Sequence, residues 1–310
     1  MNILITGANG FVGKEVCQRL IKTDHHIIAL SKSVIASNNI RHFEVTHFDR
    51  NTDFSDALKG VDVVIHLAGR AHVLNDKSEN SYQAYAEVNV GATKNLALQA
   101  ANSGVKRFIF ISSVKVNGEA TSNAAFNESD MPNPEDDYGK TKYEAEKELR
   151  VIAANSNLEV VIIRPPLIYG KGVKANFKNL INLCQLRLPL PFGDLHNKRS
   201  MVYVENLVDF MISCITHPKA ANETFLISDD EDVSTNELIQ TIRQSLDIPA
   251  LLIPIPQQWL VFFLSLIGKK SLATRLCGNL QVDICKAKTL LGWKPPYSFK
   301  QGIQKTIHNN

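Results

Sequence analysis

Short hydrophobic runs recur along the first half of the chain and alternate with longer segments of mixed polarity. The runs span residues 2–6, 26–30, 61–67, 107–112 and 159–164. Near-continuous runs of Val, Ile and Leu are typical of strands buried on both faces of a parallel sheet. Helix-like segments separate the runs, at 13–22, 84–102 and 140–154. This alternation predicts an α/β fold, a doubly wound parallel sheet of the Rossmann type.

The pattern changes after about residue 165, where the hydrophobic runs become rarer. Prolines cluster beyond that point, at 165–166, 189–191, 254–256 and 295–296. Proline lacks a backbone N–H and interrupts both helices and central strands. The sequence therefore predicts a Rossmann domain over 1–165 and a smaller, irregular α/β C-terminal region over 166–310, partly interleaved with it.

The most hydrophobic stretch is "WLVFFLSLI", residues 259–267. Its length is far below the roughly 20 residues that cross a bilayer. We expect no transmembrane segment and a buried helix at this position. Contact with a membrane surface is the alternative, because Lys269 and Lys270 follow directly.

Charge and cysteine content narrow the class of protein. The chain has 34 Lys and Arg against 31 Asp and Glu, and its net charge of +3 is not concentrated in stripes. A nucleic-acid partner is therefore not indicated. The five cysteines form no CxxC pair and no Cys/His cluster, which favours reduced thiols and no metal site. Because no charged leader precedes the first run, we expect a cytoplasmic protein.

Three glycines follow the first hydrophobic run, within the segment "TGANGFVG". Gly7 would let the strand turn sharply, Gly10 would admit a pyrophosphate close to the backbone, and Gly13 would let helix and strand pack closely. The anion would then meet free N–H groups at a helix N-terminus. Since the segment follows a strand and opens a helix, it predicts a dinucleotide site.

The end of the second predicted strand indicates which dinucleotide binds. An acidic residue there would hydrogen-bond the ribose 2′-hydroxyl and favour NAD. This chain has Ser31 and Lys32 instead, and a hydroxyl beside a cation suits a 2′-phosphate. The sequence thus favours NADP and leaves NAD possible. The alternative is that Lys32 is only a solvated loop charge.

Tyr138 and Lys142 stand four residues apart at a predicted helix start, so one helix face presents both. A phenol with a pKa near ~10 transfers protons poorly at neutral pH. We expect the neighbouring ammonium, together with a cationic nicotinamide, to lower that pKa. The pair follows a buried strand that ends at Ser112 and Ser113, where doubly wound folds bind ligands. A surface Tyr–Lys pair without function is the alternative.

Together these motifs resemble the extended short-chain dehydrogenases/reductases, in the group of nucleotide-sugar epimerases, dehydratases and reductases. The resemblance spans nearly the whole chain. Its other matching segments are "HLAG" (66–69), "VNVGAT" (88–93), "SSVKVNG" (112–118), "RPPLIYG" (164–170), "RSMVYVENLVD" (199–209) and "LGWKPP" (291–296).

The resemblance implies a role for individual residues. The implied catalytic residues are Ser113, Tyr138 and Lys142, with Tyr138 as the acid/base. The implied cofactor contacts are Gly7, Gly10, Phe11, Val12, Gly13, Ser31, Lys32, Asp49, Leu67, Ala68, Gly69, Ser112, Tyr138, Lys142 and Pro165. The implied contacts to a UDP-sugar substrate, in the second region, are Ser113, Asn176 and Arg199.

One departure from the group bears on the reaction. Its dehydratases carry an Asp-Glu pair after the catalytic hydroxyl, whereas this chain has Val114 and Lys115, so we do not expect dehydration. Ser31 and Lys32 favour an NADPH-dependent reductase. Residues 276–293 also resemble bacterial enzymes that reduce UDP-4-keto-6-deoxy-N-acetylhexosamines for surface polysaccharides.

Two other functions stay open at this point. The first is a UDP-sugar 4-epimerase that retains NAD. The second is a non-catalytic NAD(P)-sensing protein, although such proteins typically lose the tyrosine or the lysine and this chain keeps both. The resemblance also implies a homodimer, whose contacts would come from the helices predicted at 84–102 and 140–154.

Overall fold

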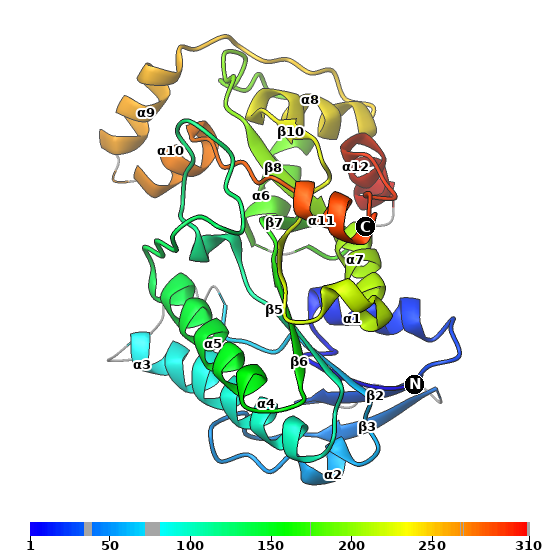
Figure 1. Ribbon diagram of the computed structural model, residues 1–310. Helices are drawn as coiled ribbons and strands as arrows, with labels where there is room; N and C mark the ends of the chain where they lie inside the picture. Colours follow the sequence, from blue (N-terminus) through cyan, green and yellow to red (C-terminus); the bar gives the residue numbers. More distant parts are fainter. Residues whose placement is uncertain (34–38, 72–80, 174, 267, 269, 309–310) are drawn as a thin grey trace.

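The computed structural model describes residues 1–33, 39–71, 81–173, 175–266, 268 and 270–308 (Figure 1). At its centre is a seven-stranded sheet in the order β3-β2-β1-β4-β5-β6-β9, with every neighbouring pair parallel. The strands are β1 (Asn2–Thr6), β2 (His26–Ser31), β3 (Ile40–Glu44), β4 (Val63–His66), β5 (Arg107–Ile111), β6 (Glu159–Arg164) and β9 (Thr224–Leu226). The doubly wound α/β fold is therefore confirmed.

Helices cover both faces of this sheet (Figure 1). One face carries α1 (Phe11–Leu20) and α7 (Val204–Thr216), which pack on Ile3 and Ile5 of β1. The other face carries α4 (Thr93–Asn102) and α5 (Asp137–Ala154), which pack around Leu4. Successive residues of β1 thus point into opposite hydrophobic layers, as expected for a strand with two buried faces. Shorter helices also belong to this part, among them α2 (Ser55–Leu58), α3 (Ser81–Ala86) and the π-helix η1 (Glu87–Ala92).

A second, three-stranded sheet has the order β10-β8-β7. Its strands are β7 (Leu167–Tyr169), β8 (Arg199–Tyr203) and β10 (Asp232–Val233). The helices of this region are α6 (Ala175–Gln185), α8 (Thr235–Ser245), α9 (Gln257–Leu266), α10 (Lys270–Cys277), α11 (Cys285–Leu291) and α12 (Phe299–His308). The boundary near residue 165 stays a prediction, and the chain crosses it, because α7 and β9 return to the first sheet.

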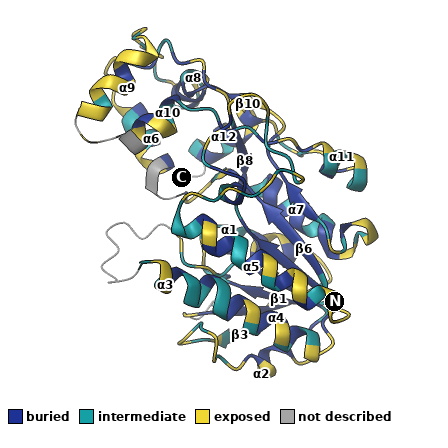
Figure 2. Ribbon diagram, turned by 60° about the vertical axis from the view of Figure 1, so that its left-hand side comes forward, coloured by how far each residue is buried: buried dark blue, intermediate teal, exposed yellow. Residues whose placement is uncertain are grey.

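Helix α9 forms where the sequence predicts a helix, but the expected burial is wrong. Trp259 is 56% exposed, Phe263 is 56% exposed and Leu266 is 67% exposed, while Leu260 is buried. Figure 2 draws most of α9 in the colour of exposed residues. The physical reason is that α9 lies at the edge of the second region and packs chiefly against α10. Within the described ranges, no helix has the length and hydropathy needed to cross a membrane.

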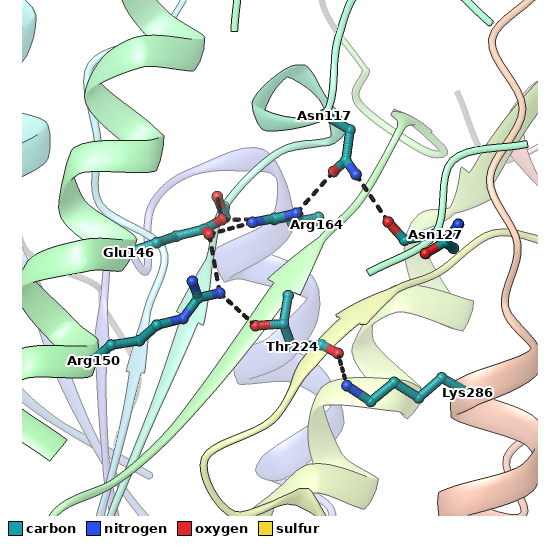
Figure 3. Close-up of polar contacts among 8 residues, drawn as sticks. Asn117, Asn127, Glu146, Arg150, Arg164, Thr224 and Lys286 are labelled. Atoms are coloured by element: carbon teal, nitrogen blue, oxygen red, sulfur yellow. Dashed lines mark hydrogen bonds and ion pairs between the residues drawn. The ribbon is translucent and has the colours of Figure 1, made fainter. Parts of the chain in front are cut away.

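A buried ion pair joins α5 to the sheet (Figure 3). Glu146 is 0% exposed and Arg164 is 1% exposed. Arg164 donates to Glu146 twice, from Nε to Oε1 at 2.9 Å and from Nη2 to Oε2 at 2.6 Å. Its Nη1 donates to Asn117 Oδ1 at 3.0 Å, and Asn117 Nδ2 donates to the Asn127 carbonyl. Both charges are therefore paired and hydrogen-bonded, which a desolvated ion pair requires.

We predict that Arg164→Met lowers the free energy of unfolding by about 3 to 5 kcal/mol, because it leaves the Glu146 carboxylate buried without its partner. Urea denaturation of the purified protein measures the loss. Arg150→Met is the matched control, since the half-exposed Arg150 reaches the same carboxylate only at 3.5 Å. The control should lose less than about 1 kcal/mol. Equal losses in the two variants would contradict this account.

Candidate active site

The glycine turn after β1 depends on close backbone packing. Gly7 has a φ of +68°, and its N–H donates to the Leu30 carbonyl at 3.1 Å. A Cβ at Gly7 would lie 2.9 Å from the Ala68 nitrogen, and one at Gly13 would lie 2.2 Å from the Gly7 carbonyl oxygen. Gly10 is the N-cap of α1 and carries no side chain into this turn. The helix N-terminus is therefore open to an anion, as a pyrophosphate site requires.

A cavity of about 460 Å³ lies beside this turn, at the carboxyl ends of β1, β2 and β4. The predicted cofactor residues that line it are Gly7, Gly10, Ser31, Lys32, Leu67, Ala68 and Gly69. The sequence did not single out its other lining residues, Asn9, Leu30, Ser33, Val45, Phe48, Arg70 and Val88. The crevice at these strand ends is where doubly wound folds bind dinucleotides. The glycine cradle and this cavity fit the adenosine diphosphate half of such a cofactor.

The two residues expected to choose the dinucleotide have different surroundings. The Ser31 hydroxyl donates to the Ser33 carbonyl at 2.8 Å and lies 3.0 Å from His42 Nε2. The Asn9 amide lies 3.3 Å from the same hydroxyl. Lys32 is exposed at the cavity. Ser31 is therefore engaged within the protein, whereas Lys32 stays accessible.

Asp49 organises its own loop rather than lining the cavity. Its Oδ1 accepts from the Asn51 N–H at 2.9 Å and from the Thr52 hydroxyl at 3.1 Å. The Asn51 hydrogen bond, with others from Thr52, lowers the pKa of this carboxyl. Asp49 thereby fixes the turn directly after Phe48, which does line the cavity.

The four other predicted cofactor residues also contact the protein itself. The Ser112 hydroxyl donates to Glu146 Oε1 at 2.6 Å, and the Pro165 carbonyl accepts from the Val114 N–H at 3.0 Å. Phe11 and Val12, the first residues of α1, pack against the hydrophobic cluster of the second region. Phe11 directly follows Gly10, which lines the cavity, and contact of these four residues with a cofactor stays a prediction.

Tyr138 and Lys142 lie on one face of α5, one helical turn apart. Lys142 is 4% exposed, and its Nζ donates to the Ile111 carbonyl at the end of β5, at 2.9 Å. The same ammonium lies 5.9 Å from the centre of the Tyr138 ring. A Cβ at Gly69 would lie 3.4 Å from Nζ. Lys142 thus stands between the cavity and the tyrosine.

Burial dominates the electrostatics of this pair. It lowers the pKa of Lys142 to about 8, although the Glu146 charge raises it. It also raises the pKa of the Tyr138 phenol, and Asp136 and Tyr85 add to that effect. The lowered phenol pKa expected from the sequence is therefore wrong for the protein alone, because desolvation disfavours the charged phenolate.

Ser113 comes from the element next to α5. It caps the short 3₁₀-helix η2 (Val114–Val116), where its Oγ accepts from the Lys115 N–H at 3.2 Å. The Lys115 ammonium bridges Glu119 at 2.6 Å and Asp136 at 2.5 Å. Asp136 is also the N-cap of α5. This bridge holds the serine turn against the helix end that carries Tyr138, and it engages Lys115 structurally.

The predicted substrate residues are described unequally. Arg199 begins β8 and donates from Nη1 to the Gly278 carbonyl at 3.1 Å. Burial lowers the pKa of Arg199, while the charge of Glu119 raises it and that of Arg275 lowers it. Arg199 therefore lies within electrostatic reach of the Lys115 bridge. Asn176 belongs to α6, and its side chain lies outside the described residues.

Comparison with known proteins identifies the family. The profile of the NAD dependent epimerase/dehydratase family matches residues 3–228 of this chain. The chain belongs to this family. The site residues described above lie within the matched range, whereas Gly278, whose carbonyl contacts Arg199, lies beyond it.

Similar proteins cover nearly the whole chain. A UDP-glucose 4-epimerase of Vibrio cholerae is 47% identical over 308 residues, 98% of this chain and 94% of the relative. An N-acetyl-alpha-D-glucosaminyl-diphospho-ditrans,octacis-undecaprenol 4-epimerase of Escherichia coli O157:H7 is 31% identical over 325 residues, 99% of this chain and 94% of the relative. Among solved structures, UDP-glucuronic acid 4-epimerase from Bacillus cereus in complex with UDP-glucuronic acid and NAD has a TM-score of 0.80 at 25% identity, covering 100% of this chain and 98% of the other.

Two buried polar residues hold the loop that lines the cavity. Neither is predicted from the sequence as a site residue. Asn89 in η1 is 1% exposed, and its amide accepts from the Arg70 N–H at 2.8 Å and donates to the Arg70 carbonyl at 3.1 Å. Asn89 Nδ2 also donates to Thr141 Oγ1 of α5 at 3.2 Å. It thereby holds the loop after β4 against α5. Its signal in the sequence is the segment "VNVGAT".

The second such residue is His66, which is 0% exposed between two threonines. Thr6 Oγ1 lies 2.6 Å from His66 Nδ1 and accepts from the N–H groups of Leu67 and Ala68, both at 3.1 Å. Because its oxygen already accepts two hydrogen bonds, this hydroxyl donates its O–H to Nδ1, which accepts. Nε2–H then donates to Thr93 Oγ1 at 2.9 Å. A neutral imidazole thus fixes the loop that lines the cavity.

We predict that this histidine makes the protein acid-sensitive. Burial lowers the pKa of His66 from 6.5 to about 3, so below pH 6.5 the unfolded chain binds a proton that the folded chain does not. Stability therefore falls as the pH drops through that window, by about 2 kcal/mol between pH 6.5 and pH 5. Urea denaturation at several pH values measures this loss.

The control is a pair of substitutions. His66→Gln should lose this part of the pH dependence, even if the variant is less stable at every pH. His196→Gln should retain it, because the His196 side chain is 81% exposed. Identical acid profiles in the wild type and His66→Gln would show that His66 is not responsible.

Proposed function

We propose that the protein is an NAD-dependent 4-epimerase of a UDP-linked hexose. The observation that carries this proposal is that buried Lys142 lies near both the Tyr138 ring and Gly69 of the cavity wall. The N-cap of the same helix, Asp136, is bridged by Lys115 to the Ser113 turn. The similar proteins add support, since all three names describe inversion at C4 of a sugar attached to a diphosphate. The sequence favours a 4-keto-sugar reductase, and these names favour its alternative, the epimerase.

The site fits a nicotinamide dinucleotide, which Gly7, Gly10, Ala68 and Lys142 would hold. The chemistry that bound NAD supplies is reversible hydride exchange with the carbinol carbon. We infer NAD rather than NADP, because only one of the two residues expected to bind a 2′-phosphate is available to it. Lys32 is accessible, whereas the Ser31 hydroxyl already donates to the Ser33 carbonyl. The Bacillus cereus structure, which contains NAD, agrees with this choice.

The chain's own residues would move one proton at the C4 oxygen. Tyr138 would accept this proton as C4 is oxidised and return it when C4 is reduced. Ser113 would hold the same oxygen by a hydrogen bond. Lys142, whose pKa is about 8, is charged in most molecules at neutral pH and favours the phenolate that forms. Val114 carries no ionisable group and Lys115 is engaged in two ion pairs. Positions 114 and 115 therefore do not supply the second acid/base pair that a dehydration needs.

The remaining parts of the proposal concern the substrate and assembly. Arg199 would bind the diphosphate of the sugar nucleotide, with Arg275 contributing positive charge nearby. A homodimer would form through α4 and α5, which lie side by side on one face of the sheet (Figure 1). Exposed apolar side chains on that face, Leu98 and Val151, agree with such a contact.

We predict that the purified protein interconverts UDP-glucose and UDP-galactose with no added cofactor. Denaturation should then release NAD, identified by mass spectrometry. UDP-N-acetylglucosamine is tested in parallel to find the preferred sugar. Stoichiometric NADPH consumption with a UDP-4-keto-6-deoxy-N-acetylhexosamine, without interconversion, would instead support the reductase. A bound nucleotide with no turnover of any of these sugars would support the sensor.

We predict that Tyr138→Phe lowers kcat at least ~100-fold, because the C4 oxygen loses its proton acceptor. The variant should still release its nucleotide on denaturation, since the phenyl ring keeps its packing. Tyr143→Phe on the same helix is the matched control and should keep full activity. Activity of Tyr138→Phe within a few-fold of the wild type would exclude the tyrosine from the mechanism.

A further inference from the structure

The segment between Asp247 and Asp283 differs in charge from the rest of the chain. It contains no acidic residue, although the whole protein has 31. Its basic residues are Lys269, Lys270 and Arg275. The segment also contains α9 and α10. The apolar helix α9 therefore lies in a stretch of sequence whose charged residues are all basic.

One face of α9 is apolar and points to solvent. It consists of Trp259, Phe262, Phe263 and Leu266, which recur at the helical spacing i, i+3, i+4 and i+7; we call it the α9 stripe. A stripe of this spacing normally packs on a protein core. Here its members are 54% to 67% exposed, and Leu260, on another side of the helix, is buried (Figure 2).

The aromatic rings of the stripe contact one another rather than the protein core. The ring centres of Trp259 and Phe263 are 6.1 Å apart and stacked, and those of Phe262 and Phe263 are 5.7 Å apart. Other exposed apolar side chains precede the helix, with Leu251 52% and Ile253 48% exposed. Several exposed apolar side chains therefore occur in α9 and before it. An exposed apolar patch on a soluble protein typically marks a site of contact with another protein, a ligand or a membrane.

We propose that the α9 stripe docks on the anionic surface of a lipid bilayer. Tryptophan and phenylalanine favour the boundary between headgroups and acyl chains. Lys269 and Lys270 follow the stripe directly in a stretch of sequence without acids, and such cations complement anionic headgroups. An amphipathic helix that lies in the interface needs both features and does not need to span the membrane.

A second copy of the chain is a poorer occupant. The helix has 10 residues and is therefore about 15 Å long. A stable protein interface buries about 800 Å² on each partner, which a stripe of that length does not supply. The like charges of two acid-free segments would also repel each other in a symmetric pair.

Docking at α9 would bring the bilayer close to the substrate end of the proposed site. Helix α10 packs against α9 and ends at Cys277, and the next carbonyl, that of Gly278, accepts from Arg199. The arginine proposed to bind the sugar diphosphate thus lies next to the end of α10, the helix that packs against α9. This placement does not alter the chemistry at Tyr138, so the two proposals fail independently.

The experiment uses the full chain and vesicles of phosphatidylcholine with one quarter phosphatidylglycerol. We expect co-sedimentation at low ionic strength and a blue shift of tryptophan emission. The shift reports Trp259, because the other tryptophan, Trp293, is only 5% exposed. Binding should weaken several-fold on vesicles of phosphatidylcholine alone, because the two lysines that follow the stripe lose their attraction.

Two variants test the stripe. Trp259→Ser combined with Phe263→Ser should lower vesicle binding at least about tenfold, because two half-exposed aromatic side chains no longer enter the interface. Met131→Ser, at a site 87% exposed in the first region, is the matched control and should bind like the wild type. Circular dichroism melting checks that both variants fold.

Three outcomes would overturn the proposal. The first is that the folded wild type fails to bind anionic vesicles at low ionic strength. The second is that the double variant binds them as well as the wild type does. The third is that the wild type does not bind vesicles but doubles in mass as its concentration rises, and that the double variant stays a monomer. That result would assign the stripe to contact with a second copy of the chain.

Discussion

The buried ion pair between Glu146 and Arg164 is the constraint on which the proposed active site depends. It fixes α5 to β6, and α5 carries both Tyr138 and Lys142. Through Asn117 it also holds the loop that follows η2 (Figure 3). An ion pair of this kind adds little net stability compared with apolar packing, but it is costly to break. Its physical effect is therefore to fix the position of one helix relative to one strand.

The periodicity of α5 explains how one helix supplies several residues to the proposed site. Tyr138, Lys142 and Glu146 recur every four residues, so all three lie on the face that meets the sheet. The strand opposite ends in two serines with different orientations. Ser112 donates to Glu146, whereas Ser113 turns away to cap η2. One serine thus anchors the helix, while its neighbour caps the next turn.

The sequence predicts those parts of the fold whose residues carry a local signal. The central strands are continuous apolar runs, and the glycine spacing marks the turn that lines the cavity. Strand β3, with the sequence "IRHFE", is missed because it lies at the sheet edge and only Ile40 is buried. Asn89 and His66 act through partners distant in the sequence, so no local pattern shows their contacts. The exposure of α9 was also not predictable, since the hydrophobicity of a segment does not show whether another part of the chain covers it.

The pKa values of the site follow from the same burial that holds it together. Desolvation moves Lys142 toward its neutral form and Tyr138 toward its protonated form, which opposes proton transfer at neutral pH. The Glu146 charge acts in the other direction and raises the pKa of Lys142. The carboxylate that anchors α5 therefore also helps to keep the ammonium charged one turn away. The position of α5 and the charge of Lys142 thus both depend on Glu146. An apolar residue of equal volume could pack in the place of Glu146, but it would not supply the negative charge.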